Sequence, residues 1–217
     1  MFKAVIFDLD GTLADTIHDI AAAVDASLSR RGLPVHGIPA YKLMVGKGFA
    51  NLVRQAVPAG FPPEATEEIR REASAFYAAH PLDRTKAYPG VDELLAALAR
   101  ASLPMAILSN KPQGLVELVV DGLFPKAGFD QVRGEGPGFP RKPDPASALD
   151  LARRLGLAAQ EVCYLGDSDV DMETAHNAGM LAVGAAWGFR GALELSGAGA
   201  DRIIAAPLEL LPILGLA

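Results

Sequence analysis

Short apolar runs alternate with segments of helical periodicity along most of this chain. The runs that predict strands are Ala4–Phe7, Met105–Leu108, Gln131–Arg133, Val162–Leu165, Leu181–Val183 and Arg202–Ile204. Between them, apolar residues recur at helical spacing in Val91–Ala101, Pro112–Gly122, Pro145–Leu155 and Val170–Ala178. Strands that alternate with helices predict an α/β fold, a doubly wound parallel sheet with helices on both faces.

The alternation is interrupted between Thr16 and Asp83, where the pattern is helical throughout. The helical stretches there are Ile17–Leu28, Ala40–Val45, Phe49–Val57 and Pro63–Ala79. We therefore expect a core domain built from residues 1–15 and 84–217, and an inserted helical domain at 16–83. Thr16 and Asp19 resemble a capping pair at the start of the first inserted helix.

Composition and charge narrow the class of protein. The 217 residues are 50% hydrophobic, which is ample for a packed core, and carry a net charge of -6 without a dense basic cluster. A nucleic-acid partner is therefore not expected. The single cysteine, Cys163, fits a reducing compartment and is expected to be a buried, inert thiol. We found neither a signal peptide nor a run of ~20 apolar residues, so we expect a soluble, cytoplasmic protein without a membrane partner.

Two aspartates follow the first predicted strand, in the segment AVIFDLDGTLADT. Residues two apart in a strand point to the same side, so Asp8 and Asp10 should face one spot. Gly11 permits a tight turn there, and Thr12 offers a hydroxyl and a backbone N–H. Two buried carboxylates need a compensating cation, and hard oxygen ligands suit Mg²⁺.

Three further strand ends carry polar residues toward the same edge of the predicted sheet. The segment VCYLGDSDVD delivers Asp167 and Asp171. The segment AILSNK presents Ser109 and Asn110, whose side chains can donate hydrogen bonds to phosphate oxygens. The segment RKPDP offers Lys142 as a counter-charge for an anionic substrate, with Arg141 as its competitor.

Four ordered motifs, DLDGTLADT, LSN, KPDP and GDSDVDMETAHNAG, give the chain a family resemblance. It resembles the haloacid dehalogenase superfamily of aspartate-nucleophile phosphotransferases, and most closely the phosphoglycolate phosphatase group. The likeness covers nearly the whole chain. The helical insertion after the first motif looks like the mobile cap of that family.

The resemblance implies a role for each matching residue. Asp8 would be the nucleophile, and Asp10 the acid that protonates the leaving group and then activates water. Ser109 and Lys142 would bind and neutralise the phosphoryl group. The implied Mg²⁺ ligands are Asp8, the carbonyl of Asp10, Asp167 and, directly or through another ligand, Asp171. The aspartate at position 10 favours phosphatase or mutase chemistry over dehalogenation.

The resemblance implies that the substrate is a small phosphorylated metabolite. We expect the protein to be a monomer or a homodimer. Thr12 and Asn110 are the candidate substrate contacts in the core, and Lys47, Arg54 and His18 those in the insertion. Lys47 lies between two glycines in MVGKGFANLVRQ. We expect Lys47→Ala to raise KM for an acidic substrate more than for p-nitrophenyl phosphate; equal effects on both would argue against this role.

Two other functions fit the same aspartates. A sugar-phosphate mutase would return the phosphoryl group to its substrate instead of releasing phosphate. A non-enzymatic phospho-acceptor module would also place aspartates on a doubly wound sheet, but it would need no helical cap.

Overall fold

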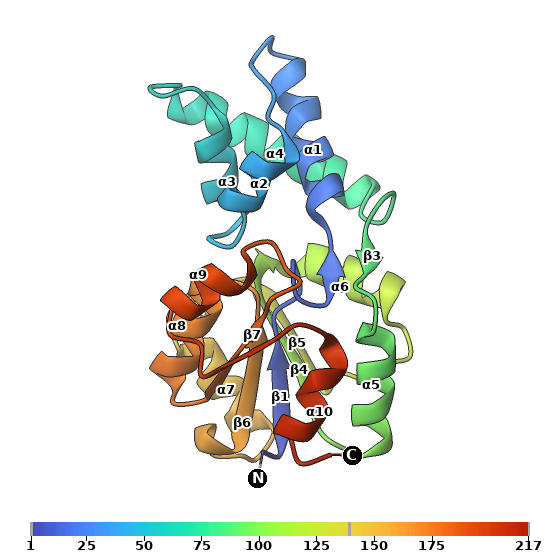
Figure 1. Cartoon of the computed structure of the whole chain (residues 1–217). Helices are drawn as coiled ribbons and strands as arrows, with labels where there is room; N and C mark the ends of the chain where they lie inside the picture. The colour runs from blue at the N-terminus through green and yellow to red at the C-terminus, as the bar shows by residue number, and fades with distance from the viewer. Residues whose placement is uncertain (1, 139, 217) are drawn as a thin grey trace.

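A six-stranded parallel sheet forms the centre of the protein in the computed structural model, which describes residues 2–138 and 140–216 (Figure 1). The strand order is β5-β4-β1-β6-β7-β8. The strands are β1 (Ala4–Phe7), β4 (Met105–Pro112), β5 (Gln131–Glu135), β6 (Val162–Gly166), β7 (Leu181–Ala185) and β8 (Arg202–Ile204). Strand β1 lies between β4 and β6, with Phe7 opposite both Ile107 and Leu165. Each predicted strand is confirmed, and four of the six extend beyond the predicted end.

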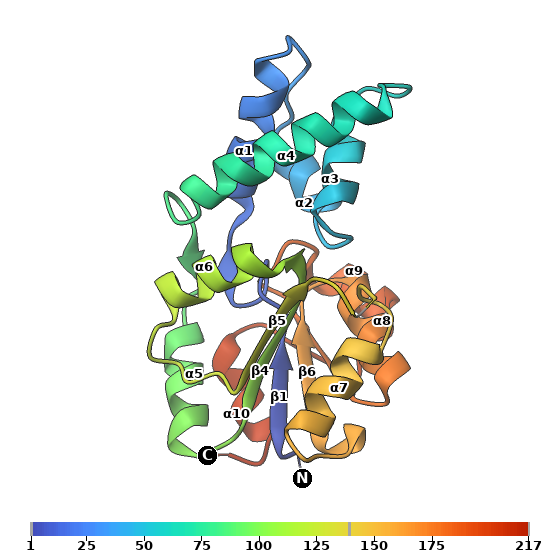
Figure 2. The ribbon, with the colours of Figure 1, turned by 180° about the vertical axis from the view of Figure 1, so that it is seen from behind.

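Helices cover both faces of this sheet, as Figures 1 and 2 show from opposite sides. The helices are α5 (Val91–Arg100), α6 (Gln113–Leu123), α7 (Ala146–Arg154), α8 (Asp169–Ala178), α9 (Gly191–Gly197) and α10 (Leu210–Ile213). Successive strand side chains point to opposite faces. Val5 and Phe7 therefore belong to the core under α5, α6 and α10, whereas Ala4 and Ile6 belong to the core with α7, α8 and α9. The doubly wound α/β prediction is confirmed.

A helical region stands above the carboxyl ends of the strands and has a core of its own. It comprises α1 (Ile17–Ser29), α2 (Ile38–Met44), α3 (Phe49–Ala56) and α4 (Pro63–Ala79). Its core includes Val24, Leu28, Tyr41, Val53 and Ile69, each fully buried. The division of the chain at residues 16 and 83 stays a prediction. No helix in the described part of the chain is long and apolar enough to cross a membrane.

Two short strands join the helical region to the sheet. Strand β2 (Ala14–Asp15) leads into α1, and β3 (Lys86–Ala87) returns from α4, and the two pair antiparallel. The sequence pattern did not predict them, because a two-residue strand leaves no periodicity. Short 3₁₀ turns at Ala159–Glu161 and Pro207–Glu209 and the helices α9 and α10 were also not predicted.

The predicted capping pair of Thr16 and Asp19 is wrong. Thr16 is the residue before α1, but its side chain makes no capping bond and instead donates to Asp10 Oδ1 at 2.7 Å. Asp19 accepts hydrogen bonds from the backbone N–H groups of Arg84 and Thr85 and from the Thr85 hydroxyl. Tertiary partners thus replace the local ones, and Asp19 connects the first turn of α1 to the segment that precedes β3.

Candidate active site

One cavity lies where β1, β4 and β6 end, beneath the helical region. Asp8 and Asp10 follow β1, Ser109 lies in β4, and Asp167 follows β6; all four line the cavity. They are 9% exposed or less. The structure therefore brings together the strand ends that the sequence predicted to meet, as expected at the carboxyl edge of a parallel sheet.

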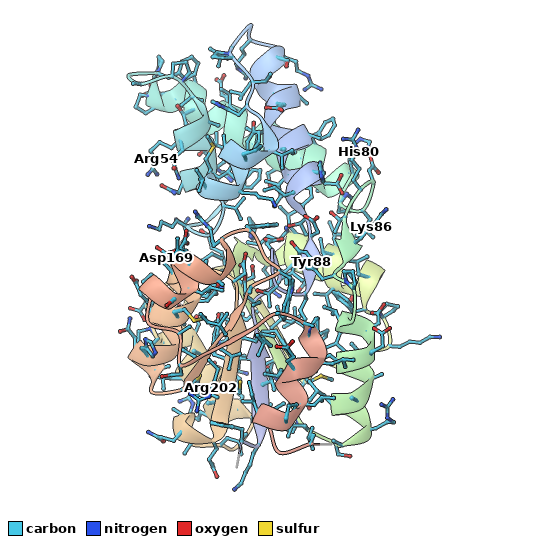
Figure 3. All side chains as sticks on the ribbon, in the orientation of Figure 1. Arg54, His80, Lys86, Tyr88, Asp169 and Arg202 are labelled. Carbon is cyan, nitrogen blue, oxygen red and sulfur yellow. The ribbon has the colours of Figure 1, made fainter. Side chains whose placement is uncertain are left out.

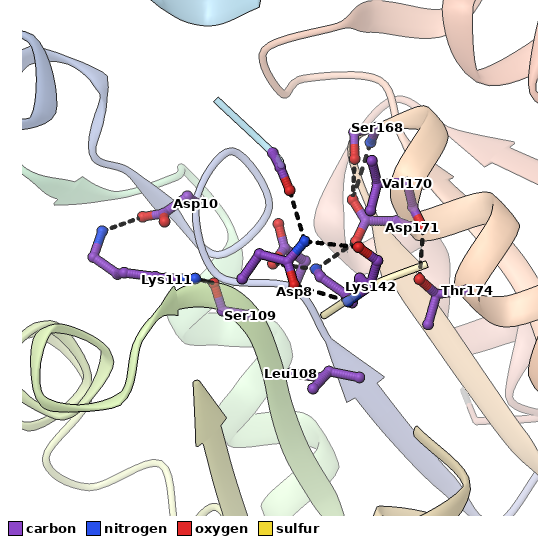
Figure 4. A network of polar contacts seen from close by, with 12 residues as sticks. Asp8, Asp10, Leu108, Ser109, Lys111, Lys142, Ser168, Val170, Asp171 and Thr174 are labelled. Atoms are coloured by element: carbon purple, nitrogen blue, oxygen red, sulfur yellow. Dashed lines mark hydrogen bonds and ion pairs between the residues drawn. The ribbon is translucent and has the colours of Figure 1, made fainter. Parts of the chain in front are cut away.

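Lys142 lines this cavity and lies between the carboxylates of Asp8 and Asp171 (Figure 4). Its Nζ donates to Asp8 Oδ1 at 2.8 Å and to Asp171 Oδ1 at 2.7 Å. The Lys142 side chain is 3% exposed. Arg141, the competing candidate, is exposed and pairs with Glu135. Of these two candidates, the structure thus makes Lys142, and not Arg141, a buried cation of the site.

Asp171 holds Lys142 rather than pointing a free oxygen into the cavity. Its Oδ1 accepts from Lys142, and its Oδ2 accepts from the backbone N–H of Ser168 at 3.1 Å and from the Ser168 hydroxyl at 2.6 Å. Both carboxylate oxygens are therefore engaged by protein donors. Asp171 is placed to orient the ammonium group, which in turn reaches Asp8.

Asp167 sits in a cradle made by two glycines. A Cβ at Gly11, which has φ +91°, would lie 2.2 Å from Asp167 Oδ2, and a Cβ at Gly188 would lie 2.3 Å from the Asp167 Cβ. Oδ2 also accepts from the backbone N–H of Phe189 at 2.6 Å. Side chains at positions 11 and 188 would therefore displace this carboxylate, so the two glycines are required for its position.

Three buried carboxylates could together hold a metal ion. Ligand oxygens of Asp8, Asp167 and Asp171 all lie within 4.8 Å of one another. Burial, with Asp171 and then Asp8 nearby, raises the pKa of Asp167 well above its ordinary value. The Lys142 ammonium group contacts Asp8 and Asp171, so one positive charge stands against three carboxylates and leaves negative charge uncompensated. The donor set and its charge therefore fit a hard divalent cation.

The pKa of Asp8 depends on opposing effects. Burial raises it, Lys142 lowers it, and Asp171 raises it again, and the result in the absence of a metal is about 7. Burial alone would lower the pKa of Lys142, but the charges of Asp171 and Asp8 raise it well above its ordinary value. Lys142 therefore remains an ammonium group, while added positive charge would favour the ionised form of Asp8.

Asn110 positions the backbone on which Lys142 lies. Its Oδ1 accepts from the Lys142 N–H at 2.9 Å, and its Nδ2 donates to the Lys142 carbonyl at 3.0 Å. The second amide hydrogen reaches the Gly46 carbonyl in the helical region at 2.9 Å. Asn110 lines the cavity, but both its amide hydrogens are engaged here, so its predicted contact with substrate stays a prediction.

Ser109 and Thr12 are placed differently. Ser109 Oγ accepts from the Lys111 N–H at 3.2 Å, which leaves its hydroxyl hydrogen for a ligand in the cavity. Thr12 is fully buried and is not among the residues that line the cavity. Its hydroxyl has no hydrogen-bond partner in the described part of the chain. Its carbonyl accepts from Trp187 Nε1 at 2.9 Å, and its role toward substrate stays a prediction.

Sequence reasoning missed the cation beside Asp10. Lys111 follows Ser109 and Asn110 in β4, and its Nζ donates to Asp10 Oδ1 at 2.6 Å. Burial disfavours its charge, but the neighbouring Asp10 carboxylate and Tyr77 hydroxyl raise its pKa. The sequence SNK could have indicated it, because Lys111 directly follows the strand-end donors. A lysine at the end of a strand is, however, ordinarily exposed.

Three core side chains donate hydrogen bonds to the helical region. Asn110 reaches the Gly46 carbonyl, Lys111 the Tyr77 hydroxyl at 2.7 Å, and Arg190 the carbonyls of Leu43 and Val45 at 2.9 and 3.0 Å. The helical region contributes apolar side chains to the lining, namely Ile20, Val45, Phe49 and Leu52. The cavity has a volume of about 40 Å³, space for a few water molecules. A phosphorylated metabolite would need this cavity to widen.

The residues of the insertion that we predicted to contact substrate do not line this cavity. The Lys47 side chain is 62% exposed, and its Nζ lies 3.9 Å from Asp169 Oδ2. Arg54, on α3, is exposed and lines a separate outer hollow (Figure 3). His18 is exposed on α1. The roles of all three toward substrate stay predictions.

Buried carboxylates at the carboxyl edge of a parallel sheet, beneath a helical cap, define an α/β enzyme whose site lies at that edge. The four motifs and the fold point to one family in particular. The chain belongs to the haloacid dehalogenase-like hydrolases, whose family model matches residues 5–185.

Similar proteins place the chain within that family. It is 34% identical to the phosphoglycolate phosphatase of Pseudomonas putida over 193 residues, which cover 86% of this chain and 70% of the relative. It is 35% identical to the phosphoglycolate phosphatase of Xanthomonas campestris pv. campestris over 192 residues, which cover 87% of this chain and 85% of the relative. A crystal structure of a predicted phosphoglycolate phosphatase from Haemophilus somnus superposes with a TM-score of 0.92 at 26% identity, covering 98% and 97%. The protein is thus a phosphatase-type hydrolase of the phosphoglycolate phosphatase-like group.

Proposed function

We propose that this protein is a Mg²⁺-dependent phosphatase that hydrolyses a small phosphate monoester, with 2-phosphoglycolate as the first candidate, through an aspartyl-phosphate on Asp8. One observation carries the proposal: the Lys142 ammonium contacts Asp8 while Asp10 lines the same cavity. The groups that we propose as nucleophile, counter-charge and acid/base, Asp8, Lys142 and Asp10, all line one cavity. The relatives named above support the choice of substrate.

Catalysis would take two displacement steps on phosphorus. In the first, an Asp8 oxygen bonds to phosphorus as the ester oxygen leaves and takes a proton from Asp10. In the second, Asp10 removes a proton from water, whose oxygen displaces Asp8 and yields inorganic phosphate. Splitting the reaction in this way replaces one difficult step with two easier ones.

The surrounding residues would stabilise the charge that moves in both steps. Lys142 would neutralise Asp8 and the phosphoryl oxygens, and the Ser109 hydroxyl would donate to one of those oxygens. Bound Mg²⁺ would supply the positive charge that keeps Asp8 and Asp167 ionised and polarises the phosphoryl group. Asp8, the Asp10 carbonyl and Asp167 are the ligands we propose, with Asp171 acting through Lys142 and Ser168.

The direct test is phosphate release from a panel of phosphorylated metabolites, assayed with Mg²⁺ and with EDTA. We expect metal-dependent release, with 2-phosphoglycolate among the best substrates. Stoichiometric release would also separate hydrolysis from a mutase, which conserves the phosphoryl group. An intact, folded protein that releases phosphate from no compound in the panel would contradict the proposal.

A second prediction concerns metal, pH and stability. The pKa of Asp8 is about 7 in the folded protein without metal, compared with an ordinary value of 3.8. Between these two pH values, Asp8 keeps its proton in the folded state but has lost it in the unfolded state. Raising the pH from about 4 to 7 should therefore lower the free energy of unfolding of the metal-free protein. Mg²⁺ binds the ionised carboxylates, so it should raise Tm more at pH 8 than at pH 5.

Thermal unfolding with Mg²⁺ or EDTA at both pH values measures this effect. Asp167→Asn should lose most of the Mg²⁺-induced shift, whereas Asp121→Asn, at an exposed position on α6, should keep it. A shift as large at pH 5 as at pH 8 would show that these carboxylates do not bind the ion.

A further inference from the structure

A buried ion pair joins Asp10 to a lysine that no motif of the sequence analysis included. Lys111 Nζ lies 2.6 Å from Asp10 Oδ1, and the two side chains are 3% and 10% exposed. Figure 4 shows this pair apart from the Asp8–Lys142–Asp171 cluster. The site therefore contains two buried lysines, each of which holds a different aspartate of the first motif.

The pair fixes one oxygen of Asp10 and leaves the other for chemistry. Oδ1 accepts both from Lys111 and from the Thr16 hydroxyl, at 2.6 and 2.7 Å. These two donors come from β4 and from the residue before α1, so they hold the carboxylate from two directions. Proton exchange with a substrate oxygen would then fall to Oδ2.

Lys111 also contacts the helical region. Its Nζ donates to the Tyr77 hydroxyl at 2.7 Å and lies 4.5 Å from the centroid of the Tyr77 ring. Tyr77 is on α4 and is 1% exposed. The contact exists only while α4 lies over the carboxyl edge of the sheet, so the ammonium group connects Asp10 to the position of the cap.

Charge pairing distinguishes Lys111 from the other two cations that line the cavity. Lys142 is shared by Asp8 and Asp171, and Arg190 donates to two backbone carbonyls and pairs with Glu194, a residue that does not line the cavity. Lys111 has Asp10 as its one carboxylate partner within the described residues. Its effect on the site should therefore pass mainly through Asp10.

We infer that Lys111 is a positioning residue: it orients Asp10 for proton exchange with the substrate, and its contact with Tyr77 makes that orientation depend on cap closure. The inference rests on the proposed phosphatase function. A poor alkoxide leaving group requires protonation by Asp10, whereas p-nitrophenolate is stable without it. Loss of positioning should therefore affect alkyl phosphates more than the aryl phosphate.

The test compares kcat/KM for 2-phosphoglycolate, or the best alkyl phosphate found, with kcat/KM for p-nitrophenyl phosphate. We expect Lys111→Met to lower the first about 100-fold and the second less than about tenfold, given the usual size of general-acid catalysis. Lys111→Arg should recover part of the loss. Tyr77→Phe, which keeps the ring, should show the same selectivity with a smaller decrease. Lys126→Met, at an exposed position, should match the wild type.

A double-mutant cycle separates positioning from direct contact with substrate. In an Asp10→Asn background, Lys111→Met should change kcat/KM, measured in a single turnover, by less than about threefold. The reason is that Lys111 acts by orienting the Asp10 carboxylate, which this background lacks. An undiminished decrease in that background, or equal decreases for both substrates in the single variant, would overturn the inference. If Lys111→Met does not fold, Tyr77→Phe replaces it in the test. A larger decrease in kcat/KM for the alkyl phosphate than for p-nitrophenyl phosphate would support the inference, and equal decreases would overturn it. Failure of the proposed phosphatase function can be distinguished from failure of this inference, because the wild type itself would then release no phosphate.

Discussion

The Asp8→Asn variant should release phosphate at least about 10³-fold more slowly than the wild type from every substrate, because the amide cannot form the covalent intermediate that we propose. Asn has nearly the shape of Asp, so the buried site should keep its packing. Lys142 retains its contact with Asp171 Oδ1 at 2.7 Å. Phosphate release at saturating substrate and Mg²⁺ measures the loss.

The stability of this variant provides an independent check. Burial raises the pKa of Asp8 to about 7, so the ionised carboxylate destabilises the metal-free fold at higher pH. Asn resembles the protonated form, so the metal-free variant should equal the wild type only below about pH 4 and should exceed it in free energy of unfolding at pH 8. Asp121→Asn, an exposed change of the same chemistry, should alter neither activity nor stability. Turnover within tenfold of wild type in a folded Asp8→Asn protein would exclude Asp8 as the nucleophile.

Lys142→Met should damage both the fold and the reaction. The ammonium group contacts Asp8 and Asp171, and all three side chains are almost fully buried. Removing one partner from a buried ion pair costs about 3–5 kcal/mol, because the remaining charges stay uncompensated. The phosphoryl group would also lose its counter-charge, so kcat should fall by about 10²-fold or more.

The pH dependence identifies the cause of this destabilisation. Acidic conditions neutralise carboxylates, so the loss in free energy of unfolding should be smaller at pH 5 than at pH 8 in EDTA. Denaturant unfolding at both pH values measures it. Lys126→Met removes an exposed ammonium and should have little effect at either pH. An equal loss at both pH values would indicate that lost packing of the lysine stem, and not unpaired charge, dominates.

Local sequence patterns predicted the sheet and the edge at which the site lies. Apolar runs such as Ala4–Phe7 and Val162–Leu165 identified buried strands, because strands covered on both faces need apolar residues throughout. The aspartates after those runs had to lie near the carboxyl edge, since neighbouring parallel strands end there together. This reasoning did not reveal that Asp8 and Asp10 would each take a separate lysine.

Sequence patterns could not predict the role of a residue whose partner is distant in the chain. Thr16 resembled a helix cap, but its hydroxyl instead donates to Asp10. Tyr77 fits the apolar stripe of α4 at Ile69 and Ala73, and nothing in that spacing indicates that its hydroxyl contacts Lys111. Lys47 looked suited to bind an anion, yet the closed structure leaves it 62% exposed.

The sequence by itself determined the α/β alternation, the helical insertion, and the carboxylates and lysine that the four motifs carry. These depend on periodicity and on residue type at a strand end, which local spacing expresses. The tertiary structure decided that Asp171 orients Lys142, that Asn110 clamps its backbone, and that Lys111 joins Asp10 to the cap. Those contacts join residues that are up to 101 positions apart, as Asp10 and Lys111 are. Only the packing of the strands, the loops that follow them and the cap determines which of the buried polar groups become partners.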